Sequence, residues 1–498
     1  MKKGEVGVGI IERVSFPDRG VVVREDGTVH LKHAVPGRTV RYRIRKKRNG
    51  SAEGILLGTE APSPIETASD PCPNADLCGG CLYQTVPYSA QLSLKEKLIT
   101  ELLHRMTPDD FTWEGLTPSP EEEGYRLKME YTFGDGERGG ELMLGLHKRD
   151  SHFDIVAAEH CRLVHEDFNV AVRETLAYFR EKKTPFYHKL RHDGYLRYLL
   201  VRRGRHSGEI LIDLVTTSGA GYREPAPGGP FEPEIGDFGE LLRGWSERLQ
   251  AAPFAGRLTG VLHTVTDSTA DAVVDQGTEI LFGTDAFEET LCGLRFRITP
   301  FSFFQNNADA AELLYRKAAE YLGSIEGMTV YDLYSGTGTI AQIAARTASH
   351  VVGVELVPEA VEAARLNAAR NGITNCEFVA GDVLKVLDSL PRKPDAIILD
   401  PPRDGVHPKA MERIAAYGVP RIVYISCKAT SLAGNLLTLR EAGYRLERAS
   451  AVDLFPQTPN VEVIALLSKG QPGGGDCLDL KERPETGTCS LRRDSHDE

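Results

Sequence analysis

The alternation of apolar and amphipathic segments in the last third of the chain constrains the fold more than any other feature. Between residues 301 and 468, the apolar stretches MTVYDLY, HVVGVEL, CEFVAGD, DAIILD and RIVYIS alternate with amphipathic stretches such as NADAAELLYRKAAEYL and PEAVEAARLNAARNG. This pattern is typical of a doubly wound parallel sheet with helices on both faces. We therefore predict an α/β fold with a Rossmann-like domain over residues 298–468.

The rest of the 498-residue chain predicts two more folded parts and a tail. Residues 1–60 hold short strand-like stretches broken by Gly, Pro and Asp turns, which is typical of a small β-barrel of the oligonucleotide-binding kind. Residues 61–297 begin with a Pro-rich joint and are expected to form a central α+β region. Residues 469–498 have few apolar residues and many charges, so we expect a disordered tail and give its Cys477 and Cys489 no role.

The compartment follows from segments that the sequence lacks. No stretch approaches the apolar length that spans a bilayer, and the start MKKGEVGVGI lacks the apolar core of a signal peptide. We expect a cytoplasmic protein with no membrane partner, and no protein partner is implied. In a reducing compartment the nine cysteines are not expected to form disulfides. Clustered cysteines then suggest a metal site, and isolated ones a core or catalytic position.

The stretch DLYSGTGT, residues 332–339, follows an apolar strand and opens a helix, which is where backbone approaches a ligand. Gly336 and Gly338 would permit that approach, but the third glycine of a dinucleotide fingerprint is missing, which favours a smaller nucleoside such as S-adenosylmethionine. The next strands end at Glu355, suited to ribose hydroxyls, at Asp382, suited to adenine, and at Asp400. The alternative is that these acids cap helices and loops.

A lone cysteine and a cluster of three are candidates for catalysis and for metal binding. Cys427 ends the strand RIVYIS at the edge of the sheet where α/β enzymes bind ligands, although cysteine is also a common core residue. Cys72, Cys78 and Cys81 form the spacing C-x5-C-x2-C, with two glycines that permit a tight wrap around one centre. Zinc and an iron–sulfur cluster both accept thiolates, so the spacing leaves both open.

Several motifs together resemble the bacterial RNA uridine-C5-methyltransferases. They are DLYSGTGT, the DPPR of residues 400–403, YISC ending at Cys427, VDLFPQTPNVEVIALL, GYRLKMEYTF and GLHKRDSHFDIVAAEHC. The resemblance covers all but the tail, and it implies that residues 1–60 are a TRAM barrel. The cluster-bearing, TRAM-containing members that this chain resembles favour 23S ribosomal RNA as the substrate.

The resemblance also implies roles for individual residues. Cys427 would be the nucleophile and Glu462 the base. S-adenosylmethionine would contact Gln305, Tyr334, Glu355, Asp382 and Asp400, with Gly336 and Gly338 shaping the loop. Cys161 would join Cys72, Cys78 and Cys81 as the fourth ligand of a [4Fe-4S] cluster, with zinc as the alternative.

The chemistry independently requires a nucleophile and a base. C5 of uracil is a poor nucleophile until a thiolate adds at C6, and a base must later remove the C5 proton. Because a free thiol is mostly protonated near neutral pH, we expect the open strand-end loop or nearby Lys428 to favour the thiolate. The family usually has a proline where this chain has Ala429, which would affect the geometry of the loop.

The basic segment RYRIRKKR provides a second link to RNA, although the net charge of −12 by itself does not. A run of this kind is often a solvated face. On a small barrel ahead of a methyltransferase we favour phosphate contact, with Tyr42 and Ile44 facing inward. The contact residues would be Arg41, Arg43, Arg45, Lys46, Lys47 and Arg48.

The sequence thus predicts an S-adenosylmethionine-dependent enzyme that forms 5-methyluridine in RNA, with 23S ribosomal RNA as the favoured substrate. The target base must leave its stack to reach Cys427. Methylation of tRNA is the alternative within the same class, and a non-catalytic RNA-binding assembly factor is the alternative from another class. Methylation of a small molecule ranks last because it would use neither the barrel nor the basic segment.

Overall fold

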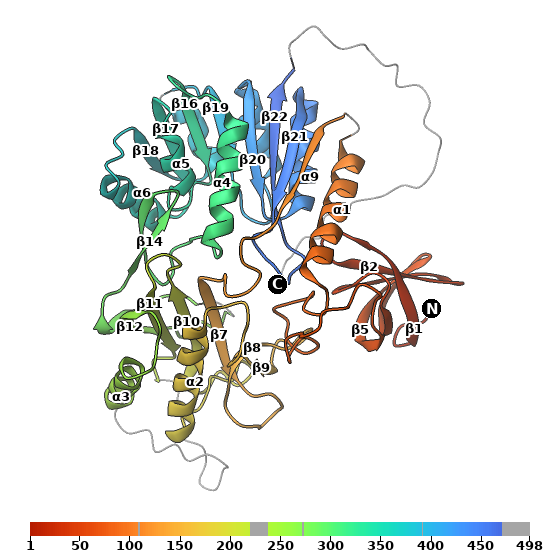
Figure 1. Cartoon of the computed structure of the whole chain (residues 1–498), viewed down its shortest axis with the longest axis vertical. Coiled ribbons are helices and arrows are strands. Elements are labelled where there is room, and N and C mark those ends of the chain that lie inside the picture. The colour runs from red at the N-terminus through yellow and green to blue at the C-terminus, as the bar shows by residue number, and fades with distance from the viewer. Residues whose placement is uncertain (108–109, 220–237, 271–272, 391, 471–498) are drawn as a thin grey trace.

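The computed structural model describes residues 1–107, 110–219, 238–270, 273–390 and 392–470, except for the side chain of Arg48. The described chain forms a small barrel, a central sheet with two helices and a larger C-terminal α/β unit (Figure 1). Residues 471–498 of the predicted tail, with Cys477 and Cys489, lie outside the described residues.

The N-terminal barrel is closed by strands in the order β1-β2-β3-β5-β4. Their bounds are β1 (Val6–Ser15), β2 (Arg19–Arg24), β3 (Gly27–Leu31), β4 (Thr39–Arg48) and β5 (Ser51–Ala61). Side chains alternate along β4, as a half-buried strand requires. Tyr42 and Ile44 lie in the barrel core while Arg41 and Arg43 are exposed, as the sequence predicted.

The central part is a seven-stranded sheet of order β13-β12-β11-β10-β7-β8-β9, with two helices packed on it. The strands are β7 (Lys128–Gly134), β8 (Met143–His147), β9 (Ile155–Ala157), β10 (Leu196–Arg203), β11 (Glu209–Thr216), β12 (Arg257–Val265) and β13 (Thr278–Gly283), and the helices are α2 (Glu166–Glu181) and α3 (Phe238–Gln250). A hairpin of β14 (Phe287–Leu291) and β15 (Leu294–Ile298) leads from this sheet to the C-terminal unit.

The C-terminal unit contains an eight-stranded sheet of order β18-β17-β16-β19-β20-β22-β21-β6. The strands are β16 (Thr329–Leu333), β17 (His350–Glu355), β18 (Cys376–Ala380), β19 (Ala396–Leu399), β20 (Arg421–Ser426), β21 (Tyr444–Val452), β22 (Glu462–Lys469) and β6 (Thr112–Thr117). The helices are α1 (Tyr88–Met106), α4 (Ala308–Leu322), α5 (Thr339–Ala344), α6 (Pro358–Arg370), α7 (Val383–Val386), α8 (Pro408–Ala416) and α9 (Ala429–Glu441).

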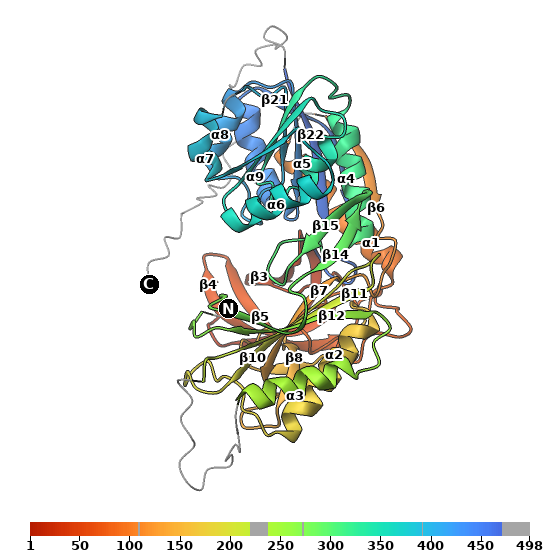
Figure 2. The ribbon, with the colours of Figure 1, turned by 90° about the vertical axis from the view of Figure 1, so that its left-hand side faces the viewer.

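Helices cover both faces of this sheet (Figure 2). Alternate residues of the strands pack in two separate cores, one with α4, α5 and α6 and the other with α1, α8 and α9. Strands that are buried on both faces explain why the stretches read as continuous apolar runs. The predicted Rossmann-like α/β domain is confirmed.

Two features of the sheet were not expected. Helix α1 and strand β6 come from the stretch that the sequence assigned to the central region, yet α1 packs on α9 and β6 pairs with β21. The sheet is also not wholly parallel, because β22 runs antiparallel to both β20 and β21. A single loop joins β21 to β22, so no crossover helix is needed.

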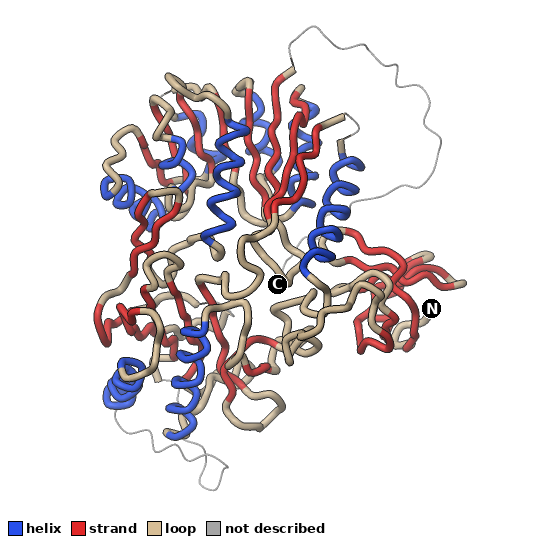
Figure 3. Tube along the Cα trace, viewed as in Figure 1, coloured by secondary structure: helices blue, strands red, loops and turns tan. Residues whose placement is uncertain are grey.

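The antiparallel strand has a direct consequence for the site. Ser426, the last residue of β20, pairs with Val463, the second residue of β22. The end of one strand and the beginning of the other therefore meet at the carboxyl edge of the parallel strands. Loops gather in the region between this sheet and the central sheet (Figure 3).

Candidate active site

The predicted cofactor loop runs from Tyr334 to Gly338, between β16 and α5. Gly338 has φ 76°, and a Cβ there would lie 2.6 Å from the Phe378 ring, so the loop needs glycine both for its backbone and for its packing. Gly336 has φ 53°, but a Cβ there would meet only the Phe303 ring, at 3.9 Å. The loop is therefore packed tightly below Gly338 and has open space at Gly336, as a ligand-binding loop requires.

Tyr334 holds the same loop in an unusual backbone conformation. Its φ is 69°, which is uncommon for a residue other than glycine. The amides of Tyr334 and Ser335 donate to the Val354 carbonyl at 2.9 and 3.0 Å, which fixes the turn. Burial and the charge of Asp382 raise the pKa of the Tyr334 hydroxyl to about 12, so Tyr334 and Asp382 lie near each other at this edge.

Two of the strand-end acids bind backbone amides in this structure. Glu355 accepts hydrogen bonds from the amides of Gly336 at 3.0 Å and Val357 at 2.9 Å. Asp382 caps α7 by accepting from the Leu384 amide at 2.8 Å. The capping alternative is therefore realised at both positions, and both carboxylates still lie at the edge where the cofactor loop ends.

Cys427 and Glu462 lie close together at the carboxyl edge. Cys427 follows β20 and is half-buried, whereas Glu462 begins β22 and is 4% exposed. Burial and the charge of Glu462 raise the pKa of the Cys427 thiol to about 11, and Arg403 opposes that rise. The thiol is thus protonated in this structure, so the expectation that the loop or Lys428 favours the thiolate is not met.

Lys428 lies near another acid and is not among the main charges that act on the thiol. Its ammonium lies 3.9 Å from Asp404. The cation that acts on the thiol is instead Arg403, whose guanidinium also donates to Asn460 at 3.1 Å. Ala429 is the first residue of α9, a position that suits proline, so the helix begins normally without one.

Buried carboxyl groups accumulate around this pair without salt-bridge partners among the described residues. Burial and the charge of Asp400 raise the pKa of Glu462 well above its ordinary range, and Glu462 Oε2 has no hydrogen-bond partner in the part of the chain that the structure describes. Burial raises the pKa of Asp400 to about 7. Burial and the charge of Asp400 raise the pKa of Asp332, in β16, to about 8. Such groups are poised to receive a cation or a proton.

Gln305 lies near the same buried acids. It is buried next to the hydroxyl of Tyr315 on α4, and Tyr315 is in turn within electrostatic reach of Asp400, Glu462 and Asp332. The structure therefore groups Gln305, Asp400, Cys427 and Glu462, and places Tyr334, Gly336, Gly338, Glu355 and Asp382 along the neighbouring strand ends.

Sequence reasoning missed three residues of this group: Asp332, Arg403 and Tyr315. Asp332 stands inside an apolar strand, and an acid at a buried strand position is a signal of function that could have been used. Arg403 was visible as the last residue of DPPR. Tyr315 gives no such signal, because an aromatic residue on an amphipathic helix usually packs in the core.

Comparisons with known proteins place this site in a family. A family model described as a methyltransferase domain matches residues 324–436, which include the glycine loop and Cys427. An uncharacterized RNA methyltransferase of Clostridium acetobutylicum is 43% identical over 470 residues, covering 94% of this chain and 99% of that protein. A relative with the same description from Caldanaerobacter subterraneus is 41% identical over 469 residues, covering 94% of this chain and all of that protein (100%). The chain belongs to this family of RNA methyltransferases.

A solved structure agrees with the fold. The tRNA (uracil-54, C5)-methyltransferase of Pyrococcus abyssi, in complex with S-adenosyl-L-homocysteine, superposes with a TM-score of 0.70 at 24% identity. The match covers 92% of this chain and 99% of that one, so the similarity extends over the barrel, central sheet and C-terminal unit together. Among the described residues of this methyltransferase, no helix is long and apolar enough to cross a membrane.

The four predicted metal-ligating cysteines are brought into one region. Burial, together with the charges of Cys161, Cys78 and Cys72, raises the pKa of Cys81 to about 12, so all four lie within electrostatic reach of one another. The Gly80 amide donates to Cys78 Sγ at 3.3 Å, and the Gln84 amide group donates to Cys81 Sγ at 3.5 Å. Within the described ranges, however, no three His, Cys, Asp or Glu side chains are placed to hold a metal ion.

The four cysteines suit a metal ion or cluster by their chemistry. The segment that carries Cys72, Cys78 and Cys81 is also fixed by hydrogen bonds from Arg149. The Arg149 guanidinium donates to the carbonyls of Ala75 at 2.8 Å, Cys78 at 3.3 Å and Cys81 at 2.8 Å. Four sulfur donors with amide donors directed at two of them are suited to thiolate ligation.

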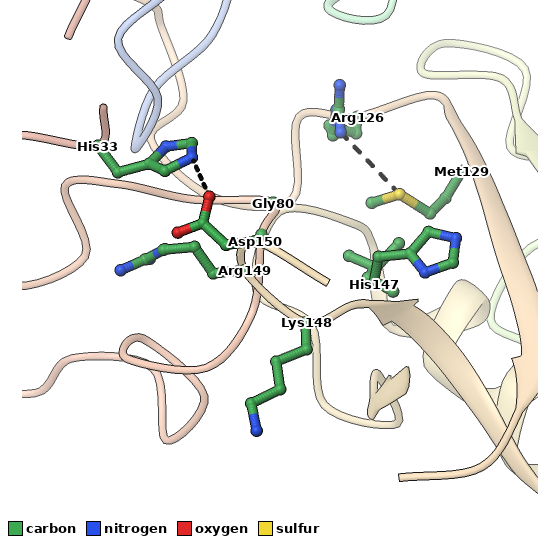
Figure 4. A pocket seen from close by; sticks show the side chains of 10 residues that line it. His33, Gly80, Arg126, Met129, His147, Lys148, Arg149 and Asp150 are labelled. Carbon is green, nitrogen blue, oxygen red and sulfur yellow. Dashed lines mark hydrogen bonds and ion pairs between the residues drawn. The ribbon is translucent and has the colours of Figure 1, made fainter. Parts of the chain in front are cut away.

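A pocket of about 330 Å³ lies beside the cysteine segment (Figure 4). It is lined by residues from the barrel, the cysteine segment and the central sheet, namely His33, Gly79, Gly80, Arg126, Met129, Leu146, His147, Lys148, Arg149 and Asp150. His33 contacts Asp150 across it at 3.4 Å. Its lining combines the cations Arg126, Lys148 and Arg149 with the acid Asp150 and apolar side chains.

The basic face of the barrel has the form that the sequence predicted. Arg43, Arg45, Lys46 and Lys47 are exposed on β4, and Arg41 pairs with Glu60 at 3.1 Å. The side chain of Arg48 lies outside the described part of the chain. The exposed cations lie on the outer face of a barrel strand whose other face is packed in the core, so they are available to a phosphate backbone.

Proposed function

We propose that this protein transfers a methyl group to C5 of uridine in RNA. The observation that carries the proposal is the antiparallel strand β22, which places a buried carboxyl, Glu462, beside the half-buried thiol of Cys427 at the edge that holds the cofactor loop. A thiol and a carboxyl in such proximity are the two groups that methylation at uracil C5 requires.

In this proposal, Cys427 carries out the nucleophilic addition and Glu462 the removal of the proton. The Cys427 thiolate forms a bond to C6 of uracil, and the electron pair of the C5–C6 double bond moves to C5 and the O4 carbonyl. S-adenosylmethionine supplies a methyl sulfonium that C5 attacks, releasing S-adenosylhomocysteine. The Glu462 carboxylate then takes the C5 proton, the C5–C6 double bond re-forms, and the sulfur leaves as thiolate.

The charge at the site supports S-adenosylmethionine as the methyl donor. Asp332, Asp400 and Glu462 are buried together with raised pKa values, and no described cation forms a salt bridge with them. A cationic ligand would lower these pKa values and would leave Glu462 ionised to act as a base. The sulfonium carries such a charge, and the glycine loop would hold its nucleoside, with Tyr334, Glu355 and Asp382 as contacts.

The barrel and the central part of the chain offer surfaces on which the RNA substrate would bind. The exposed cations of β4 and the pocket beside the cysteine segment, which Arg126 and Lys148 help to line, lie on parts of the chain that are remote in sequence from the cofactor loop. They would hold the backbone of a structured RNA while one uridine leaves its stack. We propose 23S ribosomal RNA as the substrate. The second candidate is tRNA, on which the Pyrococcus abyssi neighbour acts.

We also propose that Cys72, Cys78, Cys81 and Cys161 hold a [4Fe-4S] cluster. Four cysteines within electrostatic reach of one another, with amide donors directed at two of the sulfurs, support this proposal by their chemistry. Iron and sulfide analysis of anaerobically purified protein tests this assignment. One equivalent of zinc in place of iron would contradict it.

The decisive experiment for the methylation is a covalent trap. The protein and S-adenosylmethionine are incubated with bulk RNA containing 5-fluorouridine, whose C5 fluorine cannot be removed as a proton, and are run on a denaturing gel beside Cys427→Ala. A stable adduct that requires Cys427 supports the proposal, and sequencing the bound RNA distinguishes 23S ribosomal RNA from tRNA. No adduct from protein that binds S-adenosylmethionine would favour an RNA-binding assembly factor.

A further inference from the structure

The loop that leads to Glu462 receives hydrogen bonds from residues in several earlier parts of the chain. It spans residues 453–461, between β21 and β22, so it fixes where β22 begins. Asn307 donates to the Leu454 carbonyl at 3.2 Å, and the Tyr125 hydroxyl donates to the Pro456 carbonyl at 2.9 Å. Glu462 begins β22, where its backbone pairs with Val452 of β21, whereas its side-chain Oε2 has no hydrogen-bond partner among the described residues. The path of the loop into β22 therefore contributes to the position of the base.

Gln457 is the most constrained residue of this loop. It is buried, and its φ of 68° lies in the left-handed region that side-chain-bearing residues rarely adopt. Its carbonyl accepts hydrogen bonds from the amides of Leu82 at 2.9 Å and Tyr83 at 3.1 Å. These two residues directly follow Cys81, so the end of the cysteine segment contacts the loop of the base.

Gln91 completes the connection from α1. The Gln91 side-chain Nε2 donates to Gln457 Oε1 at 2.9 Å, and Gln91 Oε1 accepts a hydrogen bond from the backbone N–H of Gln457 at 3.0 Å. The same Gln91 amide donates to the carbonyls of Tyr83 at 3.2 Å and Val86 at 2.8 Å. Gln91 is completely buried and thus joins the loop of the base to the segment after the cysteines through one closed network.

We propose that the segment from Cys81 to Gln91 sets the position of the catalytic base, with the Gln91–Gln457 pair as the positioning contact. The proposal rests on the methylation chemistry proposed above. Gln91 and Gln457 touch no reacting atom, and they act through the backbone that leads to Glu462. A small displacement of a catalytic group has a large effect on rate, so loss of the pair should slow proton removal and leave nucleophilic attack intact.

This distinction can be measured, because the two steps give opposite signals on a denaturing gel. When the base fails, the methylated adduct between Cys427 and uridine keeps its C5 proton and accumulates. Gln91→Met retains the length of the side chain and removes both hydrogen bonds to Gln457. With ordinary uridine RNA we expect its turnover to fall by about 10-fold or more while adduct accumulates, as in Glu462→Gln used as a reference. With 5-fluorouridine RNA it should form adduct at the wild-type rate.

Gln457→Gly is the second variant and guards against misfolding of the first. Glycine suits φ 68° and keeps the carbonyl that Leu82 and Tyr83 bind, so only the side-chain contact is lost. We expect the same signature with a smaller fall in turnover. The matched control is Thr175→Val, which removes the buried acceptor of the Trp245 Nε1 hydrogen bond of 3.0 Å in the central part. It should change neither step.

Other results would overturn the inference. If the adduct on 5-fluorouridine RNA and turnover on uridine RNA fall by the same factor in both glutamine variants, the pair is merely structural. If neither changes, the pair is irrelevant to the base. Failure of the methylation proposal itself would appear earlier, as wild-type protein that forms no adduct with 5-fluorouridine RNA, so the two failures are distinguishable.

Discussion

Asp453 and Glu462 stand at opposite ends of one loop, and both are buried carboxyls, but their surroundings differ. Asp453 is inaccessible, and both of its oxygens accept from the Lys95 ammonium, at 2.8 and 2.9 Å. Glu462 is 4% exposed, makes no salt bridge with any described residue, and has an oxygen without a hydrogen-bond partner. Within one loop, the chain compensates one buried charge and leaves the other uncompensated.

The difference separates a structural acid from a chemical one. A buried ion pair with satisfied hydrogen bonds has a fixed protonation state and resists substitution of either partner. A buried carboxyl without a partner costs stability, and it persists where a ligand or a proton supplies the missing interaction. We therefore expect substitutions at the two acids to affect opposite properties.

The largest expected effect is on activity at Glu462. Glu462→Gln should lower the turnover of RNA by about 10²–10⁴-fold because the variant cannot accept the C5 proton. Its thermal stability should stay close to that of the wild type, because the raised pKa already favours the neutral form of Glu462 in the cofactor-free protein and glutamine is a neutral side chain of similar size. Methyl incorporation from labelled S-adenosylmethionine and a melting curve measure the two properties. Asp453→Asn is the control, and a loss of stability in Glu462→Gln as large as in Asp453→Asn would contradict the distinction.

The next effect is on stability at the other end of the loop. Lys95→Met leaves the Asp453 charge buried without its cation and should destabilise the packing of α1 by about 3–5 kcal/mol. Hydrogen exchange of the α1 amides measures this local free energy. Removing both partners, in Lys95→Met with Asp453→Leu, should restore much of the loss, since no charge then remains buried. A double variant as unstable as Lys95→Met alone would show that the pair contributes through packing.

The sequence predicted the fold and the position of the site more fully than the protonation and pairing of the side chains in the site. Periodicity identified the α/β domain because its strands are buried on both faces, and Gly336, Gly338 and Cys427 were visible because they follow strand ends. The neighbourhood of Cys427 and Glu462 depends on the antiparallel pairing of β22, which no local pattern encodes. The paired state of Asp453 was equally invisible, since Lys95 is 358 residues away in sequence.

The alkylation rate of Cys427 shows whether the buried acids without salt-bridge partners also change the pKa of a neighbouring group. A thiol with its pKa raised to about 11 from an ordinary value of about 9 has about 100-fold less thiolate at neutral pH than an ordinary cysteine. Alkylation of Cys427 by iodoacetamide should therefore be slow at neutral pH and should rise toward pH 11. S-adenosylmethionine should shift the profile to lower pH by adding a cation, and Arg403→Ala should shift it to higher pH. Mass spectrometry of the Cys427 peptide measures the rate, and an ordinary profile without S-adenosylmethionine would refute the influence of the acids.

Asp332 offers the smallest effect and extends the comparison to a third carboxyl. Burial and the charge of Asp400 raise its pKa to about 8 in the folded state, so folding favours the protonated form. The associated stability is fully present below about pH 4 and is lost progressively as the pH rises from there through about 8. Asp332→Asn should raise the melting temperature of the cofactor-free protein by a few degrees at about pH 9 and change it little at about pH 4 or below. An equal shift at both pH values would mean that Asp332 is compensated like Asp453, and that the uncompensated charge is confined to Glu462 and Asp400.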